Sequence, residues 1–342
     1  MQFGLIGSGS WATALAKILT DNHQSIHWWV RNEKIVTHLQ QRQHNPNYLS
    51  SVHFNREQLV LHTDVNEVFK NCDAIVIAVP SAYAIEILKP ANKEYFKGKK
   101  IVSAIKGILP ENNLLLNEYL AQEYNMVQED YFTIMGPCHA EEVAAEKLSY
   151  LTFSGLDIDT TKDVATYFTT NYLNTVVNND VAGVQFAAVL KNIYALGSGI
   201  AHGLEYGDNF LSVFIANCAD EMAGFLQKTG IPHIEVGIHE TEDHRTSPNY
   251  AASVYLGDLL VTCYSLYSRN RTFGNMIGKG YSVNAAKLEM NMVAEGYTAS
   301  KCMFSVNKKI GAEMPIAESI YKILWEGLNP ENGFKKIEEV LV

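Results

Sequence analysis

Residues 3–16 read Phe-Gly-Leu-Ile-Gly-Ser-Gly-Ser-Trp-Ala-Thr-Ala-Leu-Ala, and this stretch predicts how the fold begins. A short apolar run leads into Gly-x-Gly-x-x-Ala, after which apolar residues recur at helical spacing. Gly7 permits a sharp turn, Gly9 lets backbone N–H groups approach a pyrophosphate, and Ala12 lets the helix pack close to the strand. The N-terminus of that helix attracts an anion. We therefore expect a strand, a turn and a helix that bind a dinucleotide; the alternative is a turn with a purely structural role.

The composition of the chain is that of a globular protein with about two domains. Its 342 residues exceed what one hydrophobic core usually supports, and 47% are hydrophobic against 19% charged. The formal net charge of −10 argues against general binding to nucleic acid or to anionic membranes. Five scattered cysteines without a Cys-x-x-Cys pair favour reduced thiols and a cytoplasmic location. We expect no secretory signal and no stable membrane insertion, because the most apolar run, 181–204, contains a central lysine.

Apolar runs alternate with helical segments through the first half of the chain. The runs are 26–30, 59–62, 73–79, 100–104, 131–135, 149–153 and 173–177. Strands that alternate with helical segments predict a parallel sheet, and the ligands of such a sheet bind beyond the carboxyl ends of its strands. Five residues fall at such ends and are expected to border one cleft: Gly7, Arg31, Pro80, Lys106 and Gly136.

The pattern changes after Asn178-Asn179-Asp180, where long helical periodicities replace strands. Asn and Asp are good N-caps, so a helix is expected to begin at residue 181. The predicted fold is therefore α/β, with a Rossmann-type doubly wound sheet in residues 1–180 and an all-helical substrate and catalytic domain in residues 181–342.

Arg31 stands where cofactor specificity is usually set. An acidic residue about 20 positions beyond the glycines commonly binds the ribose hydroxyls of NAD, whereas an arginine there accommodates the 2′-phosphate of NADP. We therefore expect NADPH to be preferred. The nearby acidic residue Glu33 leaves NADH as a second candidate cofactor. The alternative for Arg31 is that it is a solvated residue before the next helix.

Lys191 is the only Asp, Glu, Lys or Arg between Asp180 and Glu205. Lysine is seldom fully buried, so a lysine within an apolar helix needs a partner or a function. Burial lowers the pKa of an ammonium group, which suits it to acid and base work near neutral pH. Asn192 and Asp258 are candidates to orient or balance it. The alternative is a lysine that reaches the surface or satisfies one structural carboxylate.

Two polar segments follow. Ser268-Arg269-Asn270 suits a small phosphate, because a guanidinium donates two parallel hydrogen bonds to its oxygens; an exposed basic turn is the alternative. Residues 233–250 contain three histidines and four carboxylates, but without His-Glu-x-x-His spacing. We expect a solvated loop there and no metal site.

These motifs together resemble the bacterial NAD(P)-dependent glycerol-3-phosphate dehydrogenases over nearly the full length. In chain order they are Gly7-x-Gly9-x-Trp11-Ala12, Val79-Pro80-Ser81, Lys106-Gly107, Gly136-Pro137-x-x-Ala140-x-Glu142, Leu190-Lys191-Asn192, Gly257-Asp258-Leu259, Ser268-Arg269-Asn270-Arg271, Glu295-Gly296-Tyr297 and Glu313-Met314-Pro315-Ile316. The resemblance implies reversible reduction of dihydroxyacetone phosphate to sn-glycerol 3-phosphate, which supplies glycerophospholipid synthesis. It also implies a homodimer.

The same resemblance implies site residues, with Lys191 as the catalytic acid/base. The implied cofactor contacts are Gly7, Gly9, Ser10, Trp11, Arg31, Lys106, Ala140, Arg269, Val293 and Glu295. The implied substrate contacts are Lys106, Gly136, Cys138, Lys191, Asp258, Ser268, Arg269 and Asn270.

The chain departs from the family pattern at two places. Cys138 and His139 stand where the family usually has Ser or Thr and an aromatic or aliphatic residue, and a thiol is a poor hydrogen-bond donor. The spacing from Lys191 to Asp258 is also longer than expected, which makes residues 233–250 an insertion. Two other functions stay open: a β-hydroxyacid dehydrogenase, which also has a dinucleotide fold, a helical domain and an active lysine, and a regulator that senses NAD(H) without turnover.

Overall fold

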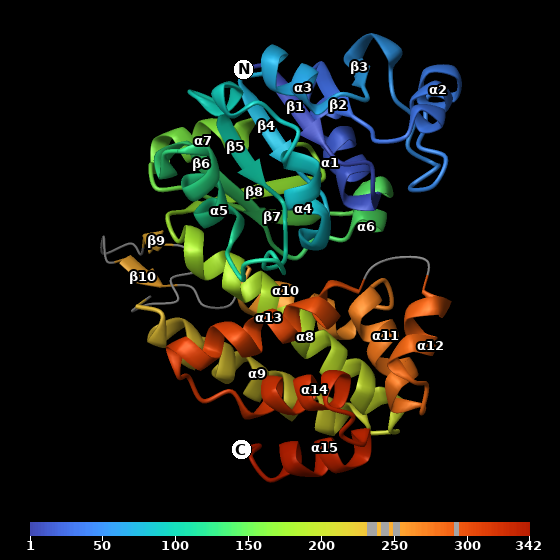
Figure 1. Cartoon of the computed structure of the whole chain (residues 1–342), viewed down its shortest axis with the longest axis vertical. Helices are drawn as coiled ribbons and strands as arrows, with labels where there is room; N and C mark the ends of the chain where they lie inside the picture. Colours follow the sequence, from blue (N-terminus) through green and yellow to red (C-terminus); the bar gives the residue numbers. More distant parts are fainter. Residues whose placement is uncertain (231–237, 241–245, 249–253, 291–293) are drawn as a thin grey trace. The chain divides into compact units, whose positions relative to one another are not determined.

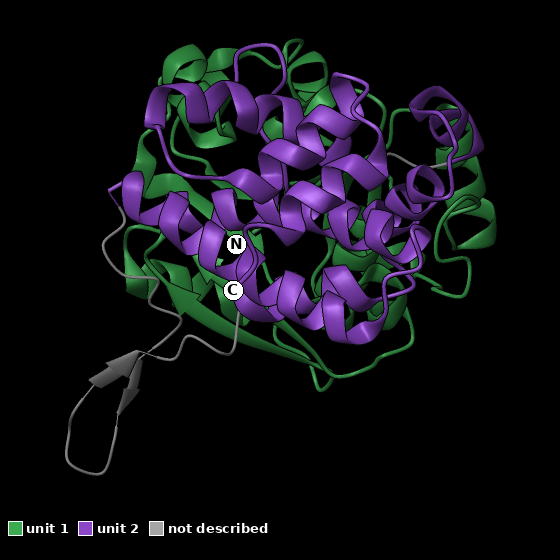
Figure 2. Cartoon of the chain, turned by 90° about the horizontal axis from the view of Figure 1, so that it is seen from below, with its two compact units in different colours: residues 1–105, 114–181 green, residues 106–113, 182–342 purple. Residues whose placement is uncertain are grey.

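The computed structural model describes residues 1–230, 238–240, 246–248, 254–290 and 294–342. The chain forms two compact units, shown in different colours in Figure 2. The first unit comprises Met1–Ile105 and Leu114–Val181, and the second comprises Lys106–Asn113 and Ala182–Val342. The short segment after the fifth strand therefore belongs to the helical unit.

An eight-stranded sheet organises the first unit, in the order β3-β2-β1-β4-β5-β6-β7-β8 (Figure 1). The strands are β1 (Phe3–Ile6), β2 (Ile26–Trp29), β3 (Leu59–His62), β4 (Ala74–Ile77), β5 (Lys100–Ser103), β6 (Tyr131–Met135), β7 (Ser149–Ser154) and β8 (Leu173–Asn178). The first six run parallel, with Phe3 of β1 between Ile26 and Ala74. All seven apolar runs that follow the glycine turn form strands, which confirms the prediction.

Helices cover both faces of this sheet, as a doubly wound fold requires. They are α1 (Ser10–Asp21), α2 (Glu33–Arg42), α3 (Val65–Asn71), α4 (Ser81–Leu88), α5 (Leu116–Tyr124), α6 (Ala140–Ala144) and α7 (Ile158–Thr166), with short 3₁₀ turns η1 (Arg56–Gln58), η2 (Lys93–Phe96) and η3 (Gln128–Asp130). Leu5 and Trp28 share a buried cluster with Leu15 of α1 and Val164 of α7. On the other face, a Cβ on Gly4 would meet Val68 of α3 at 2.3 Å.

The sheet departs from the predicted parallel arrangement at one place. β7 pairs antiparallel with β6, with Met135 opposite Thr152, and β8 then runs parallel to β7. The connection from β6 to β7 contains only α6, which has five residues and is therefore about 7 Å long. So short a helix cannot carry the chain back to the start of β6, and the strand returns in the opposite direction.

Eight helices make up most of the second unit. They are α8 (Val181–Gly203), α9 (Asp208–Lys228), α10 (Leu256–Tyr264), α11 (Arg269–Gly278), α12 (Val283–Glu289), α13 (Glu295–Ile310), α14 (Pro315–Trp325) and α15 (Pro330–Glu338). The start of α8 at residue 181 confirms the predicted helix boundary. Within the described ranges, none of the helices has the length and apolar character needed to cross a bilayer.

Glycines let α8 and α11 approach until their backbones touch. A Cβ on Gly199 of α8 would lie 2.1 Å from the Arg271 carbonyl oxygen, and one on Gly274 of α11 would lie 2.1 Å from that of Leu196. Any larger residue at either position would push the helices apart. This contact holds α11 against the C-terminal part of α8.

The histidine-containing segment 233–250 includes a small hairpin rather than only a loop. Its strands β9 (Ile238–Glu240) and β10 (Thr246–Pro248) pair antiparallel. The remaining positions, including His233 and His244, lie outside the described residues.

Candidate active site

The turn between β1 and α1 has the geometry that the glycine pattern predicts. Gly7 has φ +129°, and a Cβ there would lie 2.3 Å from the carbonyl oxygen of Ala78. Only glycine fits such a position. Gly9 is the N-cap of α1, and no atom beyond its two chain neighbours lies within 4 Å of the place where its Cβ would stand. The turn therefore leaves open space at the start of the helix.

Side chains from elsewhere in the first unit hold this turn in place. The indole Nε1 of Trp28 donates to the Gly7 carbonyl at 2.6 Å. The amide of Asn45, which is fully buried, donates to the Ser8 carbonyl at 3.1 Å and to the Thr13 hydroxyl at 2.9 Å. The role of Asn45 was not predicted, because its only local sequence signal is an Asn-Pro-Asn turn.

The residues at the turn fit the pyrophosphate of a dinucleotide. The first turn of α1 contains no acidic side chain, and its N-cap glycine supplies no side-chain hydrogen bond. The N-terminus of α1 therefore presents a partial positive charge next to the open space at Gly9. Ser10 and Trp11 are the first residues of this helix.

The other predicted residues of the first unit lie after the ends of strands. Arg31 is exposed and follows β2, and Ala140 is buried and begins α6. Gly136 has φ +126°, and a Cβ there would lie 2.9 Å from the carbonyl oxygen of Tyr150. This glycine is therefore required by close packing against β7, whatever else it contacts. Cys138 is 5% exposed and belongs to the buried cluster of the sheet.

The second unit contains a buried ion pair between Lys191 of α8 and Asp258 of α10. The Lys191 ammonium contacts the Asp258 carboxylate, and the two residues are 2% and 1% exposed. The predicted partnership with Asp258 is confirmed, and the alternative in which Lys191 reaches the surface is wrong. The alternative in which the lysine satisfies a structural carboxylate is compatible with the ion pair.

Burial lowers the pKa of Lys191 to about 8, because water no longer solvates its charge. The negative charge of Asp258 opposes this effect and raises the pKa, whereas the positive charge of Lys106 lowers it. Glu295, the first residue of α13, also raises it. The ammonium can therefore gain and lose its proton near neutral pH, as predicted for an acid/base.

The Asp258 carboxylate has unused hydrogen-bonding capacity. The main-chain carbonyl of Asp258 accepts a hydrogen bond from the Thr262 hydroxyl at 2.5 Å. The carboxylate Oδ1 of Asp258 lies 3.4 Å from the same hydroxyl. Its buried Oδ2 has no hydrogen-bond partner in the part of the chain that the structure describes. A buried acceptor without a donor is costly, so a substrate hydroxyl bound there would be stabilised.

A chain of amide hydrogen bonds passes through the residue next to Lys191 in the sequence. Asn192 donates to the Lys106 carbonyl at 3.2 Å and accepts a hydrogen bond from the Asn270 amide at 2.9 Å. The Asn270 Oδ1 accepts in turn from the backbone N–H of Gly296 at 3.0 Å. Asn192 therefore fixes the positions of its neighbours, and the hydrogen bonds that it makes here go to Lys106 and Asn270 rather than to the Lys191 ammonium.

The N-terminus of α11 carries the predicted phosphate-binding segment. Ser268 is its N-cap, is 3% exposed, and accepts a hydrogen bond from the Arg271 N–H at 3.3 Å. Arg269 follows and is half-buried. The second unit thus brings together Lys106, Lys191, Asp258, Asn270 and Glu295, while Val293 lies outside the described residues.

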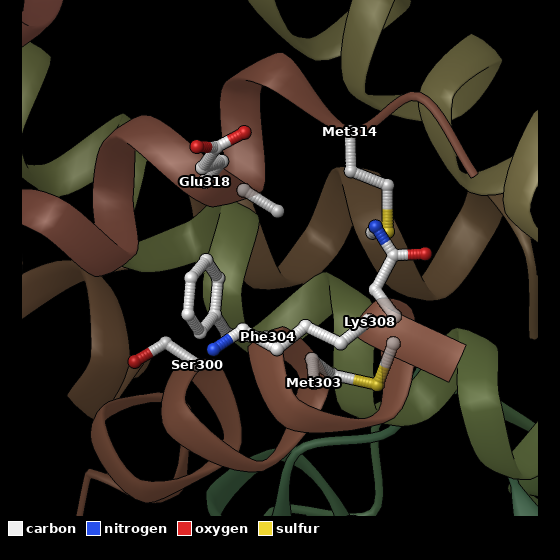
Figure 3. Close-up of a pocket in the computed structure, with 8 residues that line it drawn as sticks. Ser300, Met303, Phe304, Lys308, Met314 and Glu318 are labelled. Atoms are coloured by element: carbon white, nitrogen blue, oxygen red, sulfur yellow. The ribbon is translucent and has the colours of Figure 1, made fainter. Parts of the chain in front are cut away.

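A pocket of about 200 Å³ between α13 and α14 shares no residue with this cluster (Figure 3). It is lined by Ser300, Met303, Phe304, Asn307, Lys308, Met314, Ala317 and Glu318. None of the predicted site residues lines it.

Comparisons with known proteins agree with both units. Residues 2–160 match the N-terminal model, and residues 180–335 the C-terminal model, of NAD-dependent glycerol-3-phosphate dehydrogenase. This chain belongs to that family. It is 32% identical over 334 residues to the glycerol-3-phosphate dehydrogenase [NAD(P)+] of Bacillus pumilus, which covers 97% of this chain and 92% of that protein. The enzyme of the same name from Bacillus subtilis is 31% identical over 334 residues, which again cover 97% of this chain and 92% of that protein.

The solved structure of glycerol-3-phosphate dehydrogenase from Coxiella burnetii is similar over almost the whole chain. The TM-score is 0.86 at 27% identity, and the match covers 99% of this chain and 98% of that one. Membership of the glycerol-3-phosphate dehydrogenase family, predicted from the motifs, is thereby confirmed, as is the fold class.

Proposed function

We propose that this chain is an NAD(P)-dependent glycerol-3-phosphate dehydrogenase that reduces dihydroxyacetone phosphate to sn-glycerol 3-phosphate, reversibly, for glycerophospholipid synthesis. The observation that carries this proposal is the buried Lys191–Asp258 pair in a member of that family. A fully buried lysine with a pKa near neutrality is suited to proton transfer rather than to surface solvation.

Lys191 is the proposed general acid in the direction of reduction. The nicotinamide, when bound, supplies the hydride that the carbonyl carbon of the substrate receives. The Lys191 ammonium donates a proton to the carbonyl oxygen, and Asp258 keeps that ammonium charged until then. Lys106 adds positive charge near the developing alkoxide.

The remaining substrate contacts follow from the chemistry of the side chains. Ser268, Arg269 and Asn270 are proposed to bind the phosphate, and the unpartnered Asp258 Oδ2 to accept a hydrogen bond from the substrate hydroxyl. Gly136 and Cys138 are proposed to complete the substrate site. The thiol of Cys138 weakens any hydroxyl-type contact at this position.

The proposed cofactor is NADPH, with NADH as the second candidate. Gly7 and Gly9 with Ser10 and Trp11 would hold the pyrophosphate, and exposed Arg31 would pair with a 2′-phosphate. The other proposed cofactor contacts are Lys106, Ala140, Arg269, Val293 and Glu295.

Purified protein tests the reaction directly. We expect oxidation of NADPH only when dihydroxyacetone phosphate is present, and slower oxidation of NADH under the same conditions. Semialdehyde acids serve as the competing substrates, because a β-hydroxyacid dehydrogenase would reduce them instead. Binding of NADPH without turnover of either substrate class would indicate a regulator and contradict the proposal.

The pH dependence of both reaction directions follows from the pKa of Lys191. Reduction needs the ammonium, so its kcat/KM should be level below pH about 8 and fall about tenfold per pH unit above it. Oxidation needs the neutral amine, so its kcat/KM should rise through the same pH. Initial rates measured in both directions at constant ionic strength check this. Profiles that move in the same direction would contradict the role of Lys191.

Three further features complete the proposal. The dinucleotide-binding and substrate domains divide near residue 180, the protein acts in the cytoplasm, and it forms a homodimer. The cytoplasmic location is supported by five cysteines, none of which forms a disulfide in the described structure. Sedimentation of the purified protein would measure the number of subunits.

A further inference from the structure

Three histidine side chains of the first unit lie close to one another, and none of them belongs to the site described above. His38 lies on α2, and His44 and His53 lie in the segment that follows it. The Nε2 atoms of His38 and His44 are 3.4 Å apart, and their rings are nearly perpendicular, at 84°. The ring of His53 lies 5.4 Å from that of His44.

The hydrogen bond of His44 fixes which of its nitrogens carries the proton. Its Nδ1 lies 3.2 Å from the main-chain oxygen of Asn45, which only accepts hydrogen bonds. Nδ1 must therefore donate, and Nε2 of the neutral ring keeps its lone pair. This is the arrangement found in metal-ligating histidines, whose other ring nitrogen is held by a carbonyl or carboxylate.

The distance between the two Nε2 atoms is that of two ligands on one metal ion. Two nitrogens bound to a tetrahedral zinc ion at about 2.0–2.1 Å are separated by about 3.3 Å. The observed 3.4 Å agrees with this value. We propose that His38 and His44 form a binding site for a divalent transition metal such as Zn²⁺, with water as the remaining ligands.

The proton of His38 accounts for both states of this site. Without metal, Nε2–H of His38 donates to the lone pair of His44. Metal binding requires the tautomer of His38 that carries its proton on Nδ1, so that both Nε2 lone pairs can bind the ion. Imidazole suits Zn²⁺, Cu²⁺ and Ni²⁺. No group of three or more metal-binding side chains is present in the described ranges, so the protein supplies two ligands.

The site is connected to the glycine turn through one residue. The Asn45 carbonyl holds His44, and the Asn45 amide holds the Ser8 carbonyl and the Thr13 hydroxyl. An ion that fixes the His44 ring therefore stabilises the loop that supports the turn. We expect Zn²⁺ to strengthen dinucleotide binding, a consequence that rests on the proposed function.

Titration of the metal-free, full-length protein with Zn²⁺ tests the site independently of activity. In calorimetry, His38→Gln and His44→Gln should each lose one equivalent of zinc. His27→Gln is the matched control, because His27 and His62 form another close pair in the same unit, with nitrogens 2.9 Å apart. Loss of the equivalent in the control, or the same titration in all variants, would show an adventitious ion only and overturn the proposal.

Two further measurements sharpen the result. Electron paramagnetic resonance of bound Cu²⁺ should show two imidazole nitrogens in the wild type, and this signal should be lost in His38→Gln together with the zinc equivalent. The dissociation constant for NADPH, followed by fluorescence, should fall at least about fivefold with Zn²⁺ in the wild type but not in His44→Gln. Zinc binding without this fall would overturn the coupling alone. Absence of NADPH binding would count against the proposed function, while the zinc titration would still decide the site.

Discussion

Lys191→Met is expected to lower kcat for the reduction of dihydroxyacetone phosphate by about 10² to 10⁴, while the protein remains folded. Methionine fills a similar volume in the apolar helix but has no proton to give. The rate that remains comes from binding and from the charge of Lys106. Steady-state kinetics and circular dichroism of the variant check both parts of this prediction.

A second buried lysine provides the matched control. Lys17 of α1 is 7% exposed and pairs with Asp21 at 2.5 Å and with Glu146 at 2.9 Å. Lys17→Met removes a lysine of the same kind from a cluster that has no proposed role in the chemistry, so stability should fall and kcat should stay near the wild-type value. Equal losses of kcat in the two variants would mean that buried lysines matter here only for folding.

The sequence predicts best those features that depend on neighbouring residues. The strand before Gly7, the turn and α1 follow from a short run of residues, and the turn needs glycine for reasons of backbone geometry. The direction of a strand cannot be predicted in this way. β7 runs antiparallel to β6 because α6 is short, and nothing in the apolar run 149–153 indicates the direction of that strand. Strand existence is therefore a local property, whereas strand direction depends on the connection.

The candidate site likewise has one feature that the local sequence predicts and others that it does not. The isolation of Lys191 within an apolar helix indicates burial, and the structure confirms it. The connections among Asn192, Asn270 and Gly296 come from three helices whose packing is set by glycines on α8 and α11. Such contacts join positions far apart in the chain, so no spacing pattern announces them. Asn45 was missed for the same reason.

Asp258→Asn tests whether the carboxylate governs the proton of Lys191. An uncompensated buried charge costs about 3 to 5 kcal/mol, so Lys191 in this variant should lose its proton and its pKa should fall below the wild-type value of about 8. The pH above which reduction declines should therefore move from about 8 to below 7. A profile that still turns near pH 8 would show that Asp258 does not control the ammonium.

The stability of Asp258→Asn should depend on pH in a direction that the same argument fixes. The unfolded lysine binds its proton up to its ordinary pKa of 10.5, whereas the folded variant has released it, so the unfolded state binds more protons and stability rises with pH. We expect a free energy of unfolding about 3 to 5 kcal/mol below wild type near pH 6.5. This deficit should shrink as the pH approaches 8, where the wild-type lysine also begins to release its proton.

Urea unfolding of both proteins at pH 6.5 and 8.5 measures this change. Asp21→Asn is the matched control, because Lys17 keeps Glu146 as a second partner when Asp21 becomes neutral. Its stability loss should be smaller, and the pH at which reduction declines should stay near 8. If the deficit of Asp258→Asn is the same at both pH values, Lys191 keeps its proton without the carboxylate. The lowering of the Lys191 pKa by burial, on which its proposed role as an acid depends, would then be contradicted.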